Sequence, residues 1–385
     1  MAKKSAPRLS DSYAEARTKF WNAATAANFS ITSHVHPLKG PDGGELATDV
    51  ATFIPPGATK VIVITSGVHG VEGYLGSALQ TKALEDGLFE NLPRDTGVVL
   101  VHALNPWGMA YFTRTNEDNV DLNRNFLVNW AEGAPADHPL AAEVHRIFVA
   151  PWDDKDAQRA AQAEFMKQHS LKDLQDAVSQ GQYTNQQGLF CGGTGPTWSY
   201  KVWRERIIPS LRQYLPQVSG KPGGILHLDI HTGLAPRGER EMIGNHFPDS
   251  PAYKLAQRVW GKDAIKSTVT GNSSSSFLRG TIGETLQVPG VVSATMEIGT
   301  IPVLDVLQSL VVSNMAHPKG FDNQGLMKTA IAMMKAAFAP EDPAWARSGI
   351  KHGMRTIRQA ISGIAKIFPS PGPAPQPVPP QKPQS

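Results

Sequence analysis

Short apolar runs alternate with longer amphipathic segments along most of this 385-residue chain. The pattern predicts four buried strands, each rich in β-branched residues: Lys60–Ser66, Gly97–Leu104, Ile225–Ile230 and Val291–Ile298. Between them, segments such as Val71–Leu84 and Trp198–Leu215 place apolar residues three or four apart, as helices do. Strands that are apolar on both faces and separated by helices indicate an α/β fold, with a mostly parallel sheet covered on each side.

The pattern changes toward the C-terminus, so we expect three regions. Residues 1–340 carry the α/β pattern, with a polar, helical insertion or lid at Trp152–Gly181. Residues 341–368 place apolar residues at helical spacing, which predicts an amphipathic helix. This helix is basic, because five cations occur with no acid between them: Arg347, Lys351, Arg355, Arg358 and Lys366. Residues 369–385 contain eight prolines, which favours an extended, disordered tail.

The basic helix has two interpretations. We expect it to pack on the domain at 1–340 with its charged face in water. Weak contact with a membrane surface or a protein, through the helix and the proline-rich tail, is the alternative.

Composition excludes several classes of protein. The 37 Lys and Arg residues stand against 34 Asp and Glu, without a dense basic block before residue 340, so we expect no nucleic-acid partner. Cys191 is the only cysteine, which rules out an intrachain disulfide and a thiolate metal cluster. The N-terminus lacks an apolar stretch of the signal-peptide type, and no run of about 18 apolar residues occurs. We therefore expect a cytoplasmic protein in a reducing compartment.

A histidine and a glutamate three residues apart follow the first predicted strand. His69 and Glu72 lie in the sequence Ser-Gly-Val-His-Gly-Val-Glu-Gly at 66–73, a strand-to-helix turn in which both can reach one point. That arrangement suits a divalent metal ion, and the flanking glycines permit tight turns. Such a pair is common by chance, so a surface pair or a helix N-terminal carboxylate remains the alternative.

His231 strengthens the metal interpretation. It ends the strand Leu-Asp-Ile-His at 228–231 and precedes a Thr-Gly turn, so it should face the same sheet edge as His69 and Glu72. Two histidines and one glutamate form a catalytic zinc set that leaves a fourth position open for water. The other histidines within apolar or helical patterns are interpreted as core or surface residues: His102, His145 and His227.

The loop after the second predicted strand carries the next set of polar residues. Arg124 with Asn123 supplies a fork of donors that matches a carboxylate, and Arg114 adds a second fixed cation. Asp121 can accept the outer N–H of a metal-binding histidine and fix its tautomer. The alternative is a surface loop held by Asp–Arg pairs and Asn turns.

Glu297 stands at the end of the fourth predicted strand, after Val, Ser, Ala, Thr and Met. A glutamate there is costly unless it is paired or near a metal. Its functional interpretation is a general base, which takes a proton from the attacking water and delivers it to the leaving amine. A helix cap or a buried salt bridge is the structural alternative.

Together these motifs resemble the zinc carboxypeptidase superfamily, which comprises M14-type metallocarboxypeptidases and their deacylase relatives, succinylglutamate desuccinylase and aspartoacylase. The segments at 66–80, 105–126, 228–233 and 296–300 are similar to a bacterial M14-like branch, DUF2817, and the resemblance spans about residues 50–340. It implies a mixed, mainly parallel sheet between helices, a bound Zn²⁺ ion and hydrolysis of an amide or peptide bond.

The resemblance also implies roles for eight residues: zinc ligands at His69, Glu72 and His231, a carboxylate behind a ligand histidine at Asp121, an oxyanion contact at Arg114, substrate-carboxylate contacts at Asn123 and Arg124, and the base and proton shuttle at Glu297. One departure concerns the lid tyrosine of digestive-type carboxypeptidases, because no tyrosine follows Tyr253. The corresponding stretch, 271–277, contains four serines, so the side-chain preference does not transfer.

We therefore hypothesise a zinc-dependent, carboxypeptidase-like hydrolase that acts on a small peptide with a free carboxylate. An N-acyl amino acid deacylase is the first alternative, and only analogy with the branch resembled favours the peptidase. A non-catalytic zinc-binding adaptor is the second alternative, although a binding module has no need of Glu297. A serine hydrolase is disfavoured because no Gly-x-Ser-x-Gly elbow occurs.

Overall fold

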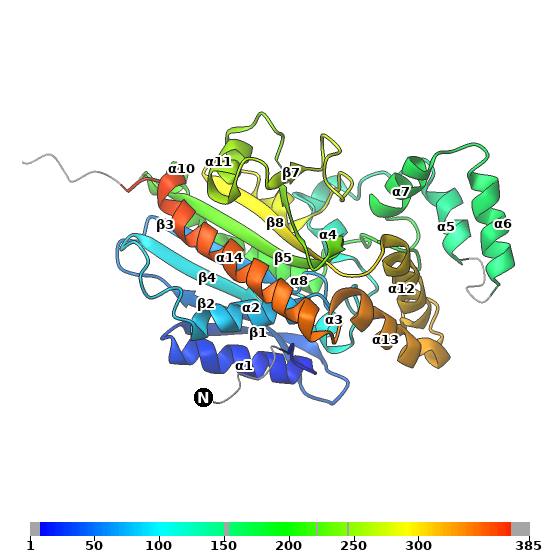
Figure 1. Ribbon diagram of the computed structural model, residues 1–385, viewed down its shortest axis with the longest axis horizontal. Coiled ribbons are helices and arrows are strands. Elements are labelled where there is room, and N and C mark those ends of the chain that lie inside the picture. The colour runs from blue at the N-terminus through cyan, green and yellow to red at the C-terminus, as the bar shows by residue number, and fades with distance from the viewer. Residues whose placement is uncertain (1–7, 150–153, 221, 245, 371–385) are drawn as a thin grey trace, which may run out of the picture.

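An eight-stranded sheet forms the centre of the protein (Figure 1). The computed structural model describes residues 8–149, 154–220, 222–244 and 246–370. The strands are β1 (Ser30–Lys39), β2 (Glu45–Phe53), β3 (Lys60–Ser66), β4 (Thr96–His102), β5 (Gly224–Arg237), β6 (Arg240–Gly244), β7 (Ile265–Ser267) and β8 (Val291–Gly299). Of the proline-rich tail predicted at 369–385, residues 371–385 lie outside the described residues.

The sheet is mixed and mostly parallel, as predicted. Its strand order is β1-β2-β4-β3-β5-β8-β6-β7. The central strands β4, β3, β5 and β8 run parallel to one another, and β6 pairs in parallel with β7. β1 and β2 add an antiparallel edge, and β6 runs antiparallel to β8. Because parallel strands end at one edge of a sheet, β3, β5 and β8 bring their last residues to the same region.

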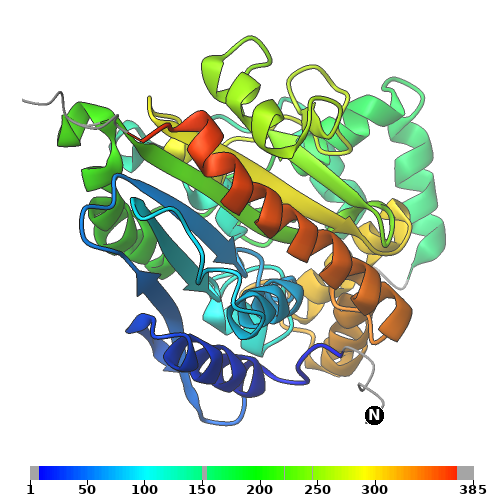
Figure 2. The same ribbon diagram turned by 60° about the vertical axis from the view of Figure 1, so that its left-hand side comes forward.

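Helices cover both faces of the sheet, which confirms the predicted fold class. They are α1 (Tyr13–Ala26), α2 (Gly73–Glu85), α3 (Pro106–Ala110), α4 (Leu122–Asn125), α5 (Ala141–Val149), α6 (Lys155–Phe165), α7 (Leu171–Ser179), α8 (Trp198–Lys201), α9 (Ile208–Leu211), α10 (Pro216–Ser219), α11 (Pro251–Trp260), α12 (Val303–Ala316), α13 (Met327–Phe338) and α14 (Pro343–Ile367). Apolar residues of α1, α2, α11 and α14 pack on one face, and those of α4, α8 and α9 pack on the other. α14 lies between α2 and α11 (Figures 1 and 2).

β5 is longer than the predicted strand and corrects one expectation. The sequence predicted that the strand ends at His231 in a Thr-Gly turn, but β5 continues to Arg237. It continues because β8 still pairs with it, so that His231 lies opposite Glu297 and Gly233 lies opposite Gly299. His231 therefore projects from within a paired strand, which restricts its backbone more than a turn would.

The predicted insertion or lid contains helices α6 and α7, which pack with α5 at one end of the molecule, beyond α12 (Figure 1). These three helices share a small apolar cluster of their own: Val144, Ile147, Phe165, Leu174 and Ala177. Residues 152–153, at the start of the insertion, lie outside the described residues.

The helix predicted at 341–368 runs over Pro343–Ile367 as α14. Its apolar side chains are buried in the main core, and Ile357 is fully inaccessible. Just beyond its end, the buried Lys60 donates a hydrogen bond from Nζ to the carbonyl oxygen of Phe368 (3.0 Å). α14 is therefore part of the core of the domain. Among the described residues, none of the helices combines the length and the hydropathy needed to cross a membrane.

Candidate metal centre

The loop between β3 and α2 carries His69 and Glu72, and Glu72 immediately precedes the helix. Gly70 lets this loop lie against α3, because a Cβ atom at Gly70 would come within 2.0 Å of the backbone carbon of Gly108. The Gly70 N–H also donates to the carbonyl oxygen of Arg114 (3.2 Å). Backbone contacts alone therefore hold the position of the loop that carries His69 and Glu72.

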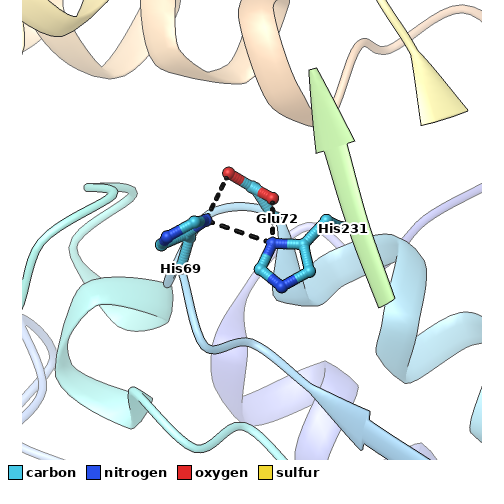
Figure 3. A group of neighbouring side chains, drawn as sticks. All are labelled: His69, Glu72 and His231. Atoms are coloured by element: carbon cyan, nitrogen blue, oxygen red, sulfur yellow. Dashed lines mark hydrogen bonds and ion pairs between the residues drawn. The ribbon is translucent and has the colours of Figure 1, made fainter. Parts of the chain in front are cut away.

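Three buried side chains converge at the end of this loop (Figure 3). His69 Nδ1 lies 2.9 Å from Glu72 Oε1 and 3.1 Å from His231 Nδ1. His231 Nδ1 lies 3.0 Å from Glu72 Oε2. Ligand atoms about 2.0–2.1 Å from a tetrahedral zinc ion lie about 3.3 Å from one another. The structure therefore brings together the three predicted ligands, and their atoms can hold a metal ion with small adjustments.

A carboxylate lies behind each of the two histidines. Asp121 Oδ1 lies 3.2 Å from His69 Nε2, and Asp229 Oδ2 lies 2.6 Å from His231 Nε2. Metal-binding histidines commonly donate their outer N–H to such a carboxylate, which leaves the inner nitrogen free as a ligand. Burial opposes protonation, but Asp229 and Glu72 raise the pKa of His231 well above its usual value. A metal ion would therefore displace a proton from His231.

Arg114 enters the centre from the loop after α3. Its Nε donates to Asp121 Oδ2 (2.9 Å), its Nη1 donates to Glu72 Oε1 (2.9 Å), and its Nη2 lies 2.8 Å from His69 Nε2. Burial lowers the pKa of Arg114, but Asp121 and Glu72 outweigh it and the net shift is upward, so the guanidinium is a fixed cation. With a metal on Nδ1 of His69, Nε2 carries the proton and its acceptor is Asp121.

Glu297 lies beside His231 on the neighbouring strand, β8. Its carboxyl group is buried, and Oε2 has no hydrogen-bond partner in the described part of the chain. Burial and the charge of Glu72 raise the pKa of Glu297 to about 8, although His231 and Arg114 oppose the shift. The backbone of Leu234 hydrogen-bonds to the same carboxyl group. A buried carboxyl group with a perturbed pKa and one oxygen without a partner is a candidate acid or base.

A cavity of about 300 Å³ collects most of the predicted site. Six predicted residues line it: His69, Arg114, Asn123, Arg124, His231 and Glu297. Glu72 and Asp121 lie behind the lining residues. Helices α7 and α12 contribute an apolar part of the wall: Leu174, Val178, Val303, Leu304, Leu307 and Leu310. The segment at 274–282, with three serines, contributes another part. The predicted insertion therefore contributes to the cavity through α7.

Arg124 has three of its five N–H groups committed to backbone carbonyls. Nε (3.0 Å) and Nη2 both donate to Ser179, the last residue of α7, and Nη1 donates to Asn123 (3.0 Å). One N–H remains on each Nη nitrogen, which is enough for a two-point contact with a carboxylate. The Phe190 ring centroid lies 5.3 Å from Cζ of Arg124 and 5.4 Å from Cζ of Arg114. Cation–π attraction from one ring thus restrains both arginines.

The charges around the centre fit a divalent cation. The ionisable groups are four buried acids and two arginines: Glu72, Asp121, Asp229, Glu297, Arg114 and Arg124. In the metal-free protein the raised pKa values of Glu297 and His231 keep both groups protonated at neutral pH, and the formal charges cancel. Once His231 has given up its proton to act as a neutral ligand and Glu297 is ionised, the same groups carry a formal charge of −2. Buried charge of this size needs a counter-charge. An ion of charge +2 held by His69, Glu72 and His231 supplies it.

Asp229, Phe190 and Ser179 were not predicted as site residues. Asp229 could have been found, because residues two apart on a strand point to the same side and Asp229 precedes His231 by two. Phe190 has φ +50 in a loop that carries no periodic pattern, so the sequence gives no sign of its position. Ser179 acts through its backbone carbonyl, which is independent of residue type.

Comparison with known proteins gives one family. The sequence profile described as "Protein of unknown function (DUF2817)" matches residues 9–352. Among curated proteins, none matches the chain.

Three solved structures are among those to which the chain is similar at low identity. An aspartoacylase family protein from Mesorhizobium loti is 13% identical, with 81% of this chain and 68% of that chain covered and a TM-score of 0.35. Thrombin activatable fibrinolysis inhibitor is 12% identical, with coverage of 94% and 77% and a TM-score of 0.43. Succinylglutamate desuccinylase from Chromobacterium violaceum is 13% identical, with coverage of 84% and 74% and a TM-score of 0.32. The side chains described above, rather than these similarities, have to identify the chemistry.

Proposed function

The chain belongs to the DUF2817 family of proteins of unknown function, and we propose that it is a zinc-dependent amide hydrolase that recognises a free carboxylate near the scissile bond. The observation that carries this proposal is the position of Glu297. Its carboxyl group lines the same cavity as His69 and His231, on the strand next to His231, and its Oε2 has no hydrogen-bond partner among the described residues. A metal site that only binds or stabilises has no use for such a group.

His69, Glu72 and His231 would hold the zinc ion through two Nδ1 atoms and a carboxylate oxygen. When bound, zinc lowers the pKa of a water molecule toward about 7 and polarises the carbonyl group of the substrate. Glu297 then accepts the proton of the attacking water and delivers it to the nitrogen of the leaving amine. In this role Glu297 has to be ionised; the charge of a bound zinc ion would favour its carboxylate form and so counter the raised pKa that Glu297 has without a metal.

The two arginines divide the remaining work. Arg114 is held against the centre by Asp121 and Glu72, so its positive charge stabilises the negative charge that develops on the carbonyl oxygen. Arg124 offers its two remaining Nη hydrogens to the carboxylate of the substrate. Asn123 keeps its side-chain nitrogen available for the same group, because its Oδ1 already accepts from the Ile282 N–H (3.0 Å).

The apolar cavity wall and the arginines together favour small substrates that combine an apolar group with a free carboxylate. C-terminal residues of peptides and N-acyl amino acids both have this chemistry. We place peptides first and N-acyl amino acids second. Zinc-dependent hydrolysis of N-acyl amino acids alone would reverse this order.

The test combines a substrate panel with one variant. Purified protein loaded with zinc is assayed on N-blocked dipeptides with a free C-terminus, on the matching C-terminal amides and on N-acyl amino acids. We expect hydrolysis of substrates with a free carboxylate only. Glu297→Gln should lower turnover by about 10²–10⁴-fold because it removes the proton acceptor, while the zinc content stays unchanged. Turnover that survives this substitution would overturn the proposed role of Glu297.

A further inference from the structure

The solvent face of α14 carries a line of unpaired cations. Its basic residues are all exposed, and in the described part of the chain none of them has an ion-pair or side-chain hydrogen-bond partner: Arg347, Lys351, Arg355, Arg358 and Lys366. Their spacings of four, four, three and eight residues place them along one side of the helix. At 1.5 Å per residue, the line is about 28 Å long.

Two more arginines widen this line. Arg240 of β6 donates to Gln359 Oε1 (2.9 Å) of α14, and Arg258 of α11 donates to the carbonyl oxygen of Lys366 (3.0 Å). Burial and the charge of Arg355 lower the pKa of Arg240. A pKa lowered partly by a like charge indicates that positive charge is locally in excess. We call these seven residues, five on α14 with Arg240 and Arg258, the basic face.

The charge of the protein is unevenly distributed, with positive charge concentrated on the basic face. Without its seven residues, the 37 Lys and Arg fall to 30, against 34 Asp and Glu, so the rest of the chain is acidic. A molecule with one basic side and an acidic remainder orients in the field of a negatively charged surface.

The form of the basic face limits what can bind to it. The apolar side of α14 is buried in the core, so the helix cannot insert into a hydrocarbon layer. Its one aromatic residue of the Phe, Tyr or Trp type, Trp345, is also buried, so it offers no stacking platform for bases of a single-stranded nucleic acid. α14 lies on the outside of the molecule, over the sheet (Figures 1 and 2). An extended, flat anionic surface matches this arrangement.

We infer that α14 is the surface by which the protein binds an anionic lipid bilayer, through charge alone and without insertion. Each Lys or Arg near such a surface contributes about a fivefold change in affinity. The interaction is screened by salt, because the Debye length shortens as the ionic strength rises and the attraction between protein and lipid charges then extends over a shorter distance. This inference is independent of the proposed hydrolase function.

The experiment measures sedimentation of the full chain with lipid vesicles. Vesicles of phosphatidylcholine with about 30% phosphatidylglycerol are compared with pure phosphatidylcholine, at low and high salt. Deletion of α14 is not informative, because the helix is part of the core. The test variant is instead Arg355→Gln/Arg358→Gln, and the matched control is Lys39→Gln/Lys328→Gln, which removes the same charge from exposed lysines elsewhere.

We expect the wild-type protein and the control to sediment with the anionic vesicles at low salt only, and the test variant to bind about 25-fold more weakly. Equal binding by the test variant and the control would overturn the inference, because net charge and not the basic face would then be responsible. Binding to a single-stranded oligonucleotide without binding to anionic vesicles would also overturn it. Thermal unfolding of each variant shows that the fold is intact.

Discussion

Asp229 is the residue whose replacement tests the design of the centre most specifically. Its Oδ2 lies 2.6 Å from His231 Nε2, and its Oδ1 accepts a hydrogen bond from Thr65 Oγ1 (2.5 Å). Thr65 Oγ1 in turn lies 3.1 Å from His227 Nε2, and all of these groups are buried. Asp229 thus links the ligand His231 to a hydrogen-bond network inside the sheet.

Asp229→Asn should preserve the fold and weaken the metal site. The amide oxygen can still accept from His231, and the amide nitrogen can donate to Thr65 if the Thr65 hydroxyl turns toward His227. No buried group is then left without a partner, so what is lost is the negative charge behind the histidine. Hydrogen bonds to charged groups contribute about 1.5–3 kcal/mol, against about 1 kcal/mol for neutral ones. The loss of about 1–2 kcal/mol corresponds to a zinc Kd about 5- to 30-fold higher, within the range for partners of metal-binding histidines.

The assay is competition for zinc between the protein and a chromophoric chelator at neutral pH. Asp86→Asn is the matched control. Asp86 is an exposed carboxylate at the other end of α2 from the centre, and its Oδ1 lies 2.9 Å from Lys82 Nζ. The control should bind zinc as the wild-type protein does. If Asp229→Asn also binds zinc with unchanged affinity and a normal unfolding temperature, Asp229 does not tune His231 and the reasoning is wrong.

Three further predictions concern the same centre. The pKa of Glu297 is raised to about 8 from 4.5, so the folded state holds this proton more tightly than the unfolded state, and the unfolding free energy of the metal-free protein should fall as pH rises through this range. Urea unfolding after chelation should show that this free energy depends less on pH in Glu297→Gln than in the wild-type protein, and an equal pH dependence in both would refute the shift. Phe190→Leu removes a cation–π contact of about 0.5–2 kcal/mol and should raise KM about 2- to 30-fold, whereas Phe190→Tyr restores it; a KM that Leu leaves unchanged would count against this positioning role. Gly70→Ala forces the loop away from the backbone of α3 and should weaken zinc binding in the chelator assay. Gly195→Ala is the control, because a Cβ atom there meets nothing within 4 Å, and equal zinc Kd values for the two variants would contradict the steric argument.

The sequence predicted the sheet because its strands are apolar on both faces. β3 matches the predicted Lys60–Ser66 at both ends, and the polar residues His69 and Glu72 follow where the apolar run stops. Burial of these apolar side chains stabilises the strand in the folded protein, so the strand predicted from the local pattern is also the one that the tertiary structure contains. The end of β5 was misplaced because Thr-Gly after His231 favours a turn locally, whereas pairing with β8 extends the strand.

The parts of the site that pattern could not reveal depend on contacts between distant segments. The carbonyl oxygen of Ser179 accepts from Arg124 only because α7 packs over the cavity. Phe190, whose own φ is +50, contacts Arg114 and Arg124 from a loop. Neither contact leaves a periodic trace in the chain. Glu297 was identifiable because an acid within an apolar strand is costly, and that cost is visible in the sequence itself.

Metal content is the most direct test of the central claim that His69, Glu72 and His231 hold one ion. Wild-type protein and His231→Ala, purified without chelators and equilibrated with zinc, are compared by elemental analysis, with His145→Ala as a control for the loss of a histidine from a distant helix. We expect about one zinc per chain in the wild-type protein and in the control, and less than about a tenth of that in His231→Ala, which lacks one of the three ligands. Equal zinc in all three proteins, or no zinc in the wild-type protein, would contradict it.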